Sequence, residues 1–476
     1  MGDVTDALAR FTAALSLDAV PPAVGARAQR LVLDAAAIAV RARADGESTA
    51  ALLAGLAAAG LAPGSCGLFG TAETCAPAAA AGINAALVHT LDFDDTHMGA
   101  SVHVGAPVVP AALAAAQAAG ADGRIAVAAV VAGMEVMIRL ARALDPPRHY
   151  ARGYHPTATT GVFGAAAAAA RALGLDAGQT AAAFGIALSS AAGTLQFHAN
   201  GAWTKRLQVG LAAEAGVRAA FLARHGFTGA ADAVEGAHGL LAVFSDGAEP
   251  ARATAGLGSV WETLAIGVKP YPACRFAHAA IDGLLDLRRE MGLDAVAAAR
   301  IAFVEVGLSR KALAAVAEPE ARKRRARNVV DAQFSIYFLA AAALLTGGVR
   351  WDDYPRLIGD AAVNALAARV RPLQDETVEA LYPAAMAGRV TIVLDDGRRL
   401  TRQVPEPSGE PGCFPSDAAL RDKAIALAGP VLGEAGAGAL CAAALDLAGV
   451  GPDALFGAAA AVLEQDSDMR SIRPHV

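Results

Sequence analysis

Apolar positions spaced three and four residues apart predict helices over most of the chain. The pattern is clear after a proline pair near residue 21, where Ala28, Leu31, Val32 and Ala35 share one face. Residues rich in glycine and proline interrupt the pattern, and residues 148–156 are expected to form a loop. Helices are predicted within residues 5–60, from about residue 77, as a pair between 107 and 144, and as a series from 157 to 225. Helical sequence resumes at residue 416.

The pattern changes near residue 265. Residues 300–307 and 389–394 are rich in β-branched and aromatic side chains, and the second run leads through an Asp-Asp-Gly turn into residues 398–404. Two such runs around an Asp-Gly turn predict a β-hairpin. With helices expected at 329–346 and 355–368, this part of the chain is predicted to be a smaller α+β domain.

Alanine provides most of the hydrophobic character of the chain. Hydrophobic residues make up 55% of the 476 residues and the mean hydropathy is +0.40, but alanine is above all a strong helix former. The longest weakly charged stretch, residues 177–204, is rich in Ala, Gly and Ser, so we expect a buried helix there and not a membrane span. The acidic N-terminus lacks the pattern of a signal peptide. No membrane partner is therefore predicted.

Charge and cysteine content exclude several other classes of protein. The five cysteines are scattered and form no CxxC pair, which fits reduced thiols in a cytoplasmic protein and provides no framework for zinc or an iron–sulfur cluster. The net charge is −6, from 40 basic and 46 acidic side chains. Nucleic acid is therefore not expected as the main partner.

The densest polar cluster lies at residues 91–103, between two apolar helical segments. Its members are Asp92, Asp94, Asp95, Thr96, His97 and His103. Ionised groups are not buried without partners or a purpose, so the cluster is a candidate active site in which His103 could exchange protons. The alternative is a solvated helix connection with capping aspartates. Metal-binding spacings such as the EF-hand and HExxH are absent, and we predict no metal.

Several further side chains are suited to holding a carboxylate. They are His155, Thr157, Lys205, Lys269, Arg275 and His278. The first two stand at the start of a predicted helix, whose free amide groups attract anions, although Thr157 could also be an ordinary cap. The last three share a stiff double-proline loop, where fixed cations bind carboxylates well, although the loop could also be a plain domain linker.

These motifs occur in an order that resembles one protein family. They are LDFDDTH at 91–97, HVGAPVVP at 103–110, GYH at 153–155, GVFGAAAAA at 161–169, KRL at 205–207, GFTG at 226–229, EG at 235–236 and KPYPACR at 269–275. Together they resemble the MmgE/PrpD family, which includes 2-methylcitrate dehydratase, cis-aconitate decarboxylase and iminodisuccinate epimerase. The match extends from about residue 5 to about residue 450 and is specific to the family, not to one member.

The resemblance implies a mainly α protein, with a large all-helical domain built from both chain ends and a smaller inserted α+β lid domain. The expected domains are residues 1–267, 268–405 and 406–476, in a homodimer without metal or organic cofactor. The active site is expected between the helical domain and the lid. By motif position, its catalytic groups are Asp92, Thr96, His103, His155, Lys205 and Lys269. Arg275, His278 and Tyr337 are expected to bind the substrate.

Two positions depart from the family pattern. Family members often have histidine after Lys-Arg-Leu, where this chain has Gln208. The tyrosine of the lid helix is displaced by one position, at Tyr337, so the roles of both residues stay open.

The family's reactions break a C–H, C–O or C–C bond beside a carboxylate, where developing negative charge must be neutralised. We hypothesise a cofactor-independent lyase acting on a small di- or tricarboxylic acid. The two lysines would bind carboxylates, His103 and His155 would exchange protons, and Asp92 and Thr96 would orient them. The alternatives are a two-base epimerase or isomerase of a small dicarboxylate, and a non-catalytic carboxylate-binding homologue.

Overall fold

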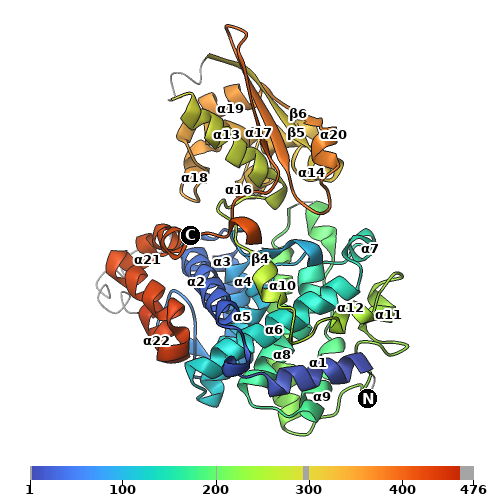
Figure 1. Ribbon diagram of the computed structural model, residues 1–476. Helices are drawn as coiled ribbons and strands as arrows, with labels where there is room; N and C mark the ends of the chain where they lie inside the picture. Colours follow the sequence, from blue (N-terminus) through green and yellow to red (C-terminus); the bar gives the residue numbers. More distant parts are fainter. Residues whose placement is uncertain (1–2, 200, 293–299, 461–476) are drawn as a thin grey trace. The chain divides into compact units, whose positions relative to one another are not determined.

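The structure is a computed structural model that describes residues 3–199, 201–292 and 300–460. It contains two compact units, each described here by itself. Unit 1 comprises the chain up to residue 266 together with the chain from residue 416, and unit 2 comprises residues 267–415 (Figure 1). Helices dominate, so the prediction of a mainly α protein is confirmed.

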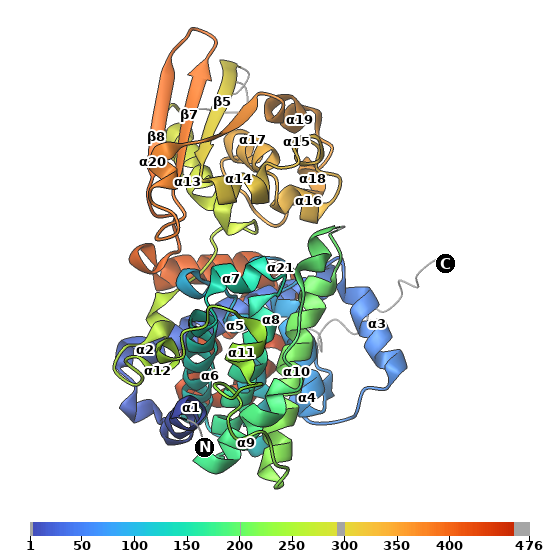
Figure 2. The same cartoon turned by 90° about the vertical axis from the view of Figure 1, so that its right-hand side faces the viewer.

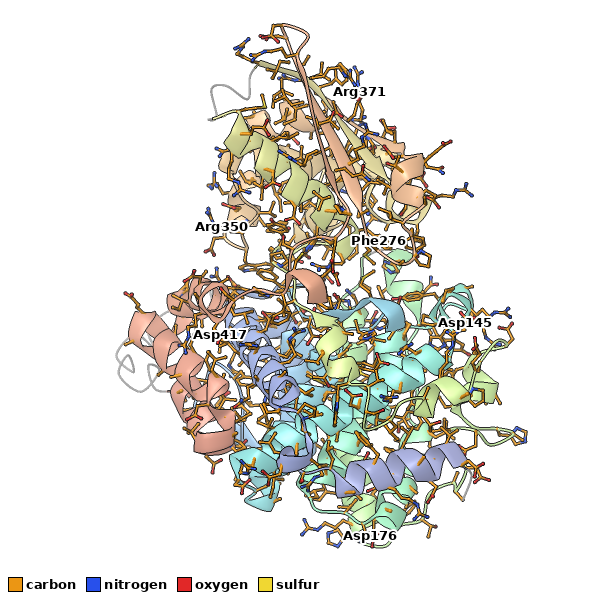
Figure 3. The ribbon with its side chains drawn as sticks, in the orientation of Figure 1. Asp145, Asp176, Phe276, Arg350, Arg371 and Asp417 are labelled. Atoms are coloured by element: carbon orange, nitrogen blue, oxygen red, sulfur yellow. The ribbon has the colours of Figure 1, made fainter. Side chains whose placement is uncertain are left out.

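Unit 1 is built from helices. They are α1 (Asp3–Ala14), α2 (Pro22–Asp45), α3 (Thr49–Ala59), α4 (Pro77–Val88), α5 (Gly105–Ala119), α6 (Gly123–Ala143), α7 (Pro146–Ala151), α8 (Pro156–Ala172), α9 (Ala177–Leu188), α10 (Thr204–Arg224), α11 (Leu240–Phe244), α12 (Ala251–Thr254), α21 (Asp417–Leu445) and α22 (Leu447–Ala460). Proline begins α2, α4, α7 and α8, because a first-turn residue needs no amide donor. Asp176, labelled in Figure 3, caps α9 in a capping box with Gln179.

Small residues let the central helices of unit 1 approach closely. A Cβ added at Gly133 of α6 would lie 2.7 Å from the carbonyl oxygen of Gly164 in α8. A Cβ added at Gly210 of α10 would likewise lie 2.7 Å from the carbonyl oxygen of Gly82 in α4. Helices α6, α8 and α10, which Figure 2 labels, therefore pack backbone against backbone and bury their alanine faces.

Helix α21 packs against α2. Lys423 Nζ lies 2.6 Å from Asp34 Oδ1, and Arg30 Nε lies 2.5 Å from Asp417 Oδ1 at the start of α21 (Figure 3). Among the described helices, α21 alone is long and apolar enough to cross a membrane by length and composition. Its backbone leaves helical geometry at Gly433, where φ is 72° and ψ is 166°.

Two predictions for unit 1 are wrong in detail. Residues 148–156 were expected to form a loop, but the first four complete α7, which the proline at its N-terminus starts. Residues 177–204 were expected to form one buried helix, but α9 ends at Leu188. The chain then passes Gly193, which has a φ of 110°. Glycine adopts this angle readily, but it is not a helical angle.

Unit 2 contains a four-stranded sheet in the order β6-β5-β7-β8. Strand β5 (Ile301–Leu308) pairs in parallel with β6 (Val370–Gln374) and antiparallel with β7 (Gly388–Leu394), which pairs with β8 (Arg399–Val404). The two predicted strands and the hairpin are confirmed. Strand β6 was not predicted, because a proline within the run argues against a strand except at the edge of a sheet, where β6 lies.

The helices of unit 2 are shorter than predicted. They are α13 (His278–Glu290), α14 (Arg310–Val316), α15 (Glu320–Lys323), α16 (Val329–Gln333), α17 (Ile336–Thr346), α18 (Asp353–Leu357), α19 (Ala361–Ala367) and α20 (Glu376–Glu379). The segment predicted at 329–346 divides at Ser335, whose hydroxyl accepts a hydrogen bond from the Phe338 amide at 3.1 Å and caps α17. The segment predicted at 355–368 divides in the same way at Asp360.

The second boundary of unit 2 lies at residue 415, whereas the sequence analysis placed it at 405. Residues 406–415 hydrogen-bond to the beginning of the unit. The Val268 amide donates to the Gly409 carbonyl at 2.9 Å, and the Ser408 hydroxyl donates to Asp282 at 2.6 Å. The entering and leaving segments of the chain are thus joined within unit 2.

Candidate functional site

The polar cluster predicted at residues 91–103 forms a tight connection between α4 and α5. Every residue from 89 to 97 is buried, so the alternative of a solvated helix connection is wrong. Asp92 adopts a φ of 52°, a left-handed conformation that aspartate tolerates better than most residues. This turn reverses the chain after α4 and places the following carboxylates inside unit 1.

Asp94 lies between two imidazoles. Its Oδ2 atom is 2.6 Å from His89 Nδ1 and 3.4 Å from His103 Nδ1. Burial opposes ionisation of Asp94, but the imidazoles of His89 and His103 outweigh it and hold the pKa of Asp94 well below its usual value. Burial lowers the pKa of His89 to about 4. His89 therefore donates to an ionised Asp94 as a neutral ring, and the negative charge of Asp94 is available to stabilise a protonated His103.

His155 also lies next to His89. The ring centroids of His89 and His155 are 6.0 Å apart with the rings stacked, and those of His89 and His103 are 4.8 Å apart, edge to face. His155 Nδ1 lies 3.0 Å from Gln208 Oε1. Burial, followed by the neighbouring His89 and Lys205, lowers the pKa of His155 well below its usual value. The two predicted proton carriers, His103 and His155, thus belong to one cluster of three imidazoles, of which His89 and His155 are buried and His103 is partly exposed.

Lys205 and Asp92 form an ion pair in the same cluster. Lys205 Nζ lies 2.5 Å from Asp92 Oδ1, and their side chains are 18% and 7% exposed. The lysine lies in the first turn of α10 and the aspartate follows α4, and these helices pack together. An ammonium group has three donors, so Lys205 can keep Asp92 as a partner and still bind an incoming carboxylate.

Two members of the predicted cluster, Asp95 and the backbone of His103, have supporting contacts. Asp95 accepts hydrogen bonds from the amides of Val104 and Gly105, both at 2.9 Å, and so fixes the start of α5. The Thr157 hydroxyl accepts a hydrogen bond from the His103 amide at 3.1 Å. The Thr96 hydroxyl is buried and has no hydrogen-bond partner among the residues that the structure describes.

His97 belongs to a separate buried ion-pair group. Its Nε2 atom lies 3.2 Å from Glu262 Oε2, and Glu262 also pairs with Arg142. This contact joins the cluster to the segment before unit 2 and gives His97 a structural role.

The remaining predicted residues belong to unit 2. Lys269 lies on the loop before α13. Arg275 Nη2 lies 2.6 Å from Glu410 Oε1, and Arg275 Nη1 lies 3.0 Å from His278 Nδ1. The Tyr337 hydroxyl donates to the Ala317 carbonyl at 3.5 Å, and the guanidinium carbon of a neighbouring arginine lies 4.4 Å from its ring centroid. The roles of these four residues in binding substrate stay predictions.

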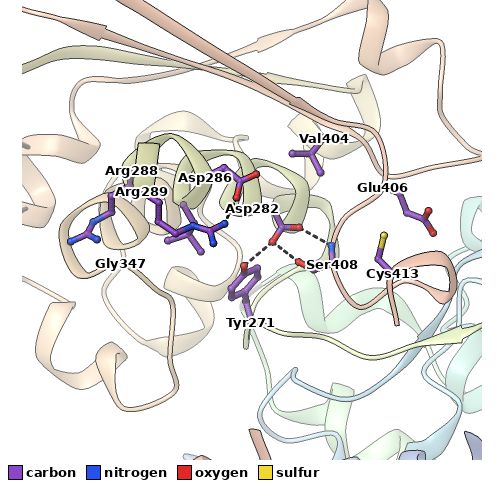
Figure 4. Close-up of a pocket in the computed structure, with 11 residues that line it drawn as sticks. Tyr271, Asp282, Asp286, Arg288, Arg289, Gly347, Val404, Glu406, Ser408 and Cys413 are labelled. Carbon is purple, nitrogen blue, oxygen red and sulfur yellow. Dashed lines mark hydrogen bonds and ion pairs between the residues drawn. The ribbon is translucent and has the colours of Figure 1, made fainter. Parts of the chain in front are cut away.

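Unit 2 has a cavity of about 530 Å³ of its own. At its wall, Asp282 accepts hydrogen bonds from the hydroxyls of Tyr271 at 2.7 Å and Ser408 at 2.6 Å (Figure 4). These bonds join the entering and leaving segments of the unit. No predicted site residue is among those that line the cavity.

His89, Asp94 and His103 also form a group that could hold a metal, because their ligand atoms lie within 4.8 Å of one another. This group differs from the donors weighed from the sequence, since it includes His89 and omits Asp92, Asp95 and His97. The carboxylate already accepts a 2.6 Å hydrogen bond from His89, which accounts for that donor pair without an ion. The absence of a metal cofactor stays a prediction.

Sequence reasoning missed His89 and gave Asp94 no role of its own. His89 ends an apolar helix, two residues before the polar motif, and looked like part of that helix. Its distance of five residues from Asp94 was the available signal, because the end of a helix followed by a reversal can bring such residues together. Gln208 was noted only as a departure from the family pattern.

In this mainly helical protein two imidazoles share one buried carboxylate, and a third imidazole and a lysine–aspartate pair lie close to them. Such clusters of titratable groups are typical of sites for acid–base chemistry. The chain belongs to the MmgE/PrpD family. The model of the family's N-terminal domain matches residues 6–253 and that of its C-terminal domain matches residues 271–447.

The chain is similar to several proteins named cis-aconitate decarboxylase or cis-aconitate decarboxylase-like protein. A cis-aconitate decarboxylase from Aspergillus terreus is 28% identical over 450 residues, which is 90% of each chain. A cis-aconitate decarboxylase-like protein from Aspergillus oryzae is 28% identical over 368 residues, 73% of this chain and 74% of that protein. The human cis-aconitate decarboxylase is 35% identical over 158 residues, 32% of each chain.

Proposed function

We propose that this protein is a lyase that acts on a small di- or tricarboxylic acid. It breaks a carbon–carbon or carbon–oxygen bond next to a carboxylate and needs no metal or organic cofactor. Family membership and the cis-aconitate decarboxylases among the relatives support this reaction class. The observation that carries the proposal is the position of His103 Nδ1, 3.4 Å from an ionised and buried Asp94.

His103 is the proposed proton carrier. Its side chain is 18% exposed, whereas that of Asp94 is 1% exposed, so a substrate can reach the ring while the carboxylate behind it stays dry. A charge fixed in a dry environment stabilises imidazolium more strongly than one in water. His155 is the second proton-exchanging group. Asp92 orients Lys205 through their ion pair, and Thr96 is assigned from its position in the family motif.

The lysines are the proposed carboxylate ligands. Lys205 provides an ammonium group in the histidine cluster, and Lys269 is assigned from its position in the family motif. Arg275 and His278 contact Glu410 and each other within unit 2, which supports a role in stiffening the loop that carries Lys269. Tyr337 is retained as a substrate-binding candidate.

A two-base epimerase is the second candidate, because the cluster holds two separate imidazoles, His103 and His155, that can exchange protons. Solvent deuterium entering the recovered substrate, with no loss of water or carbon dioxide, would favour it. The inserted lid, a homodimer and a cytoplasmic location are parts of the same proposal. Sedimentation of the purified protein tests the dimer.

The proposal is tested by incubating the protein with methylcitrate, citrate and cis-aconitate while recording carbon dioxide release and the absorbance of new double bonds. We expect turnover of one or more of these acids, and at least a tenfold loss in a His103→Ala variant that keeps the helical circular dichroism of the wild type. His225→Ala, at an exposed histidine that follows α10, is the matched control. Turnover by His103→Ala equal to that of the control removes His103 from the chemistry. Binding of these acids without turnover, deuterium exchange or loss of water would instead indicate a non-catalytic homologue.

A further inference from the structure

Gln208 is held in one orientation by two hydrogen bonds. Its Nε2 atom donates to the carbonyl oxygen of Thr194 at 3.1 Å, and its Oε1 atom lies 3.0 Å from His155 Nδ1. If the amide were turned over, its oxygen would face the Thr194 carbonyl oxygen, and both groups would be acceptors. The amide oxygen therefore faces His155.

The segment that contains Thr194 is itself fixed to the start of α8. The His155 amide donates to the Gly193 carbonyl at 3.1 Å, and the Leu195 amide donates to the Gly153 carbonyl at 2.8 Å. Gly193 has a φ of 110°, and a Cβ there would lie 2.7 Å from the Cβ of Ala158. The partner of the Gln208 amide group is thus part of a rigid surface, which keeps the amide oxygen pointed at the imidazole.

An amide oxygen is an acceptor only, so Nδ1 of His155 must carry a proton. We infer that Gln208 is a positioning residue that keeps Nδ1 of His155 protonated, so that Nε2 is the nitrogen that gains and loses a proton during turnover. The role of Nε2 in turnover rests on the proposed function. The assignment of the tautomer does not, because it follows from the hydrogen bonds of Gln208. A single proton moves between the substrate and Nε2, and the Nδ1–H bond to Gln208 is unchanged.

The surroundings of His155 decide which form is present before substrate binds. His89 stacks on the ring, Phe197 lies edge-on with centroids 5.4 Å apart, and the charges of Lys205 and His103 act on it. Burial and these neighbours favour the neutral ring, while the bond to Gln208 favours the charged one. Nε2 is then a hydrogen-bond acceptor in the free protein. The substrate group that faces it must carry a proton, as a hydroxyl or as a C–H beside a carboxylate.

The experiment is long-range ¹H–¹⁵N NMR of the histidine side chains in the full-length protein, which distinguishes the two neutral tautomers. His155→Gln identifies the signals of His155. We expect the Nδ1–H tautomer in the wild type at neutral pH, and loss of its dominance in Gln208→Leu. Gln208→Glu loses the donor to the Thr194 carbonyl but keeps an acceptor that can face Nδ1, and it should restore that tautomer. Gln196→Leu, at an exposed position of the neighbouring segment, is the matched control.

The Nε2–H tautomer in the wild type, or an unchanged tautomer in Gln208→Leu, overturns the inference. The result does not require a substrate, so failure of the proposed lyase activity is a separate outcome. Where turnover is measured, the carboxylate of Gln208→Glu favours the charged ring and should displace the pH profile of kcat to higher pH relative to wild type. A profile that does not move in either Gln208 variant also counts against the inference.

Discussion

Replacement of Asp94 by asparagine tests how the cluster prepares His103. The substitution keeps the size of the side chain but removes the charge. In the wild type that charge lies 2.6 Å from His89 Nδ1 and 3.4 Å from His103 Nδ1. Asparagine presents either a neutral oxygen or an NH₂ group to the two rings, and so cannot stabilise an imidazolium as a carboxylate does.

The size of the effect follows from Coulomb's law. Two unit charges separated by the 3.4 Å between Asp94 and His103 interact by about 5 kcal/mol at an effective dielectric constant of about 20. Because His103 is partly exposed, water screens the pair, and we retain about half of that value. A loss of about 2.5 kcal/mol of charge stabilisation in the transition state corresponds to a fall in kcat of roughly 10²-fold, within the range typical of a general acid or base.

The assay compares kcat and KM of wild type, Asp94→Asn and Asp122→Asn on the acid that the screen identifies. Asp122 is an exposed cap of α6, and asparagine caps helices about as well as aspartate, so this variant controls for the loss of an aspartate. We expect the fall in kcat with little change in KM, because Asp94 contacts the histidines and not the substrate. Turnover of Asp94→Asn within threefold of the control, in a protein that unfolds at the same temperature, would refute the reasoning.

Two further predictions concern stability. In Gly133→Ala the new Cβ would lie 2.6 Å from Val108 Cγ1, so we expect a loss of about 1–3 kcal/mol in the free energy of unfolding. Gly55→Ala places a methyl group in open space beside a helix and should raise the free energy of unfolding by about 0.4–1 kcal/mol. Equal midpoints of urea unfolding for the two variants would contradict close packing at Gly133. Burial raises the pKa of Asp95 to about 7, whereas an unfolded aspartate titrates near 4. The folded protein therefore binds this proton more tightly, and up to about 4 kcal/mol of stability present below pH 4 is lost as pH rises to 7. Asp95→Asn should lack this decline when unfolding is measured from pH 4 to 8, and parallel curves for variant and wild type would show that Asp95 does not titrate in this range.

The sequence determined the class of the fold because its signals are local. The alanine-rich periodicity required helices, and the Asp-Gly turn required the hairpin of β7 and β8. Local signals were weaker where a single residue determines where a helix ends. Ser335 interrupts a predicted helix by capping the next one. In the other segment that looked continuous, α9 ends at Leu188, and the backbone at Gly193 is not helical. The edge strand β6 was not predicted from the sequence, because its register is set by β5, which lies far away in the sequence.

The candidate site shows the same division. The sequence marked Asp92, His103, His155 and Lys205 as chemically suited to hold and protonate an acid, because residue type and motif are read directly from the chain. Only the tertiary structure showed that His89 shares a carboxylate with His103 and that Gln208 faces His155. Those contacts join separate helices and loops, and their energies depend on burial and on distances of about 3 Å. No spacing along the chain fixes such distances, because they arise when α4, α8 and α10 pack together.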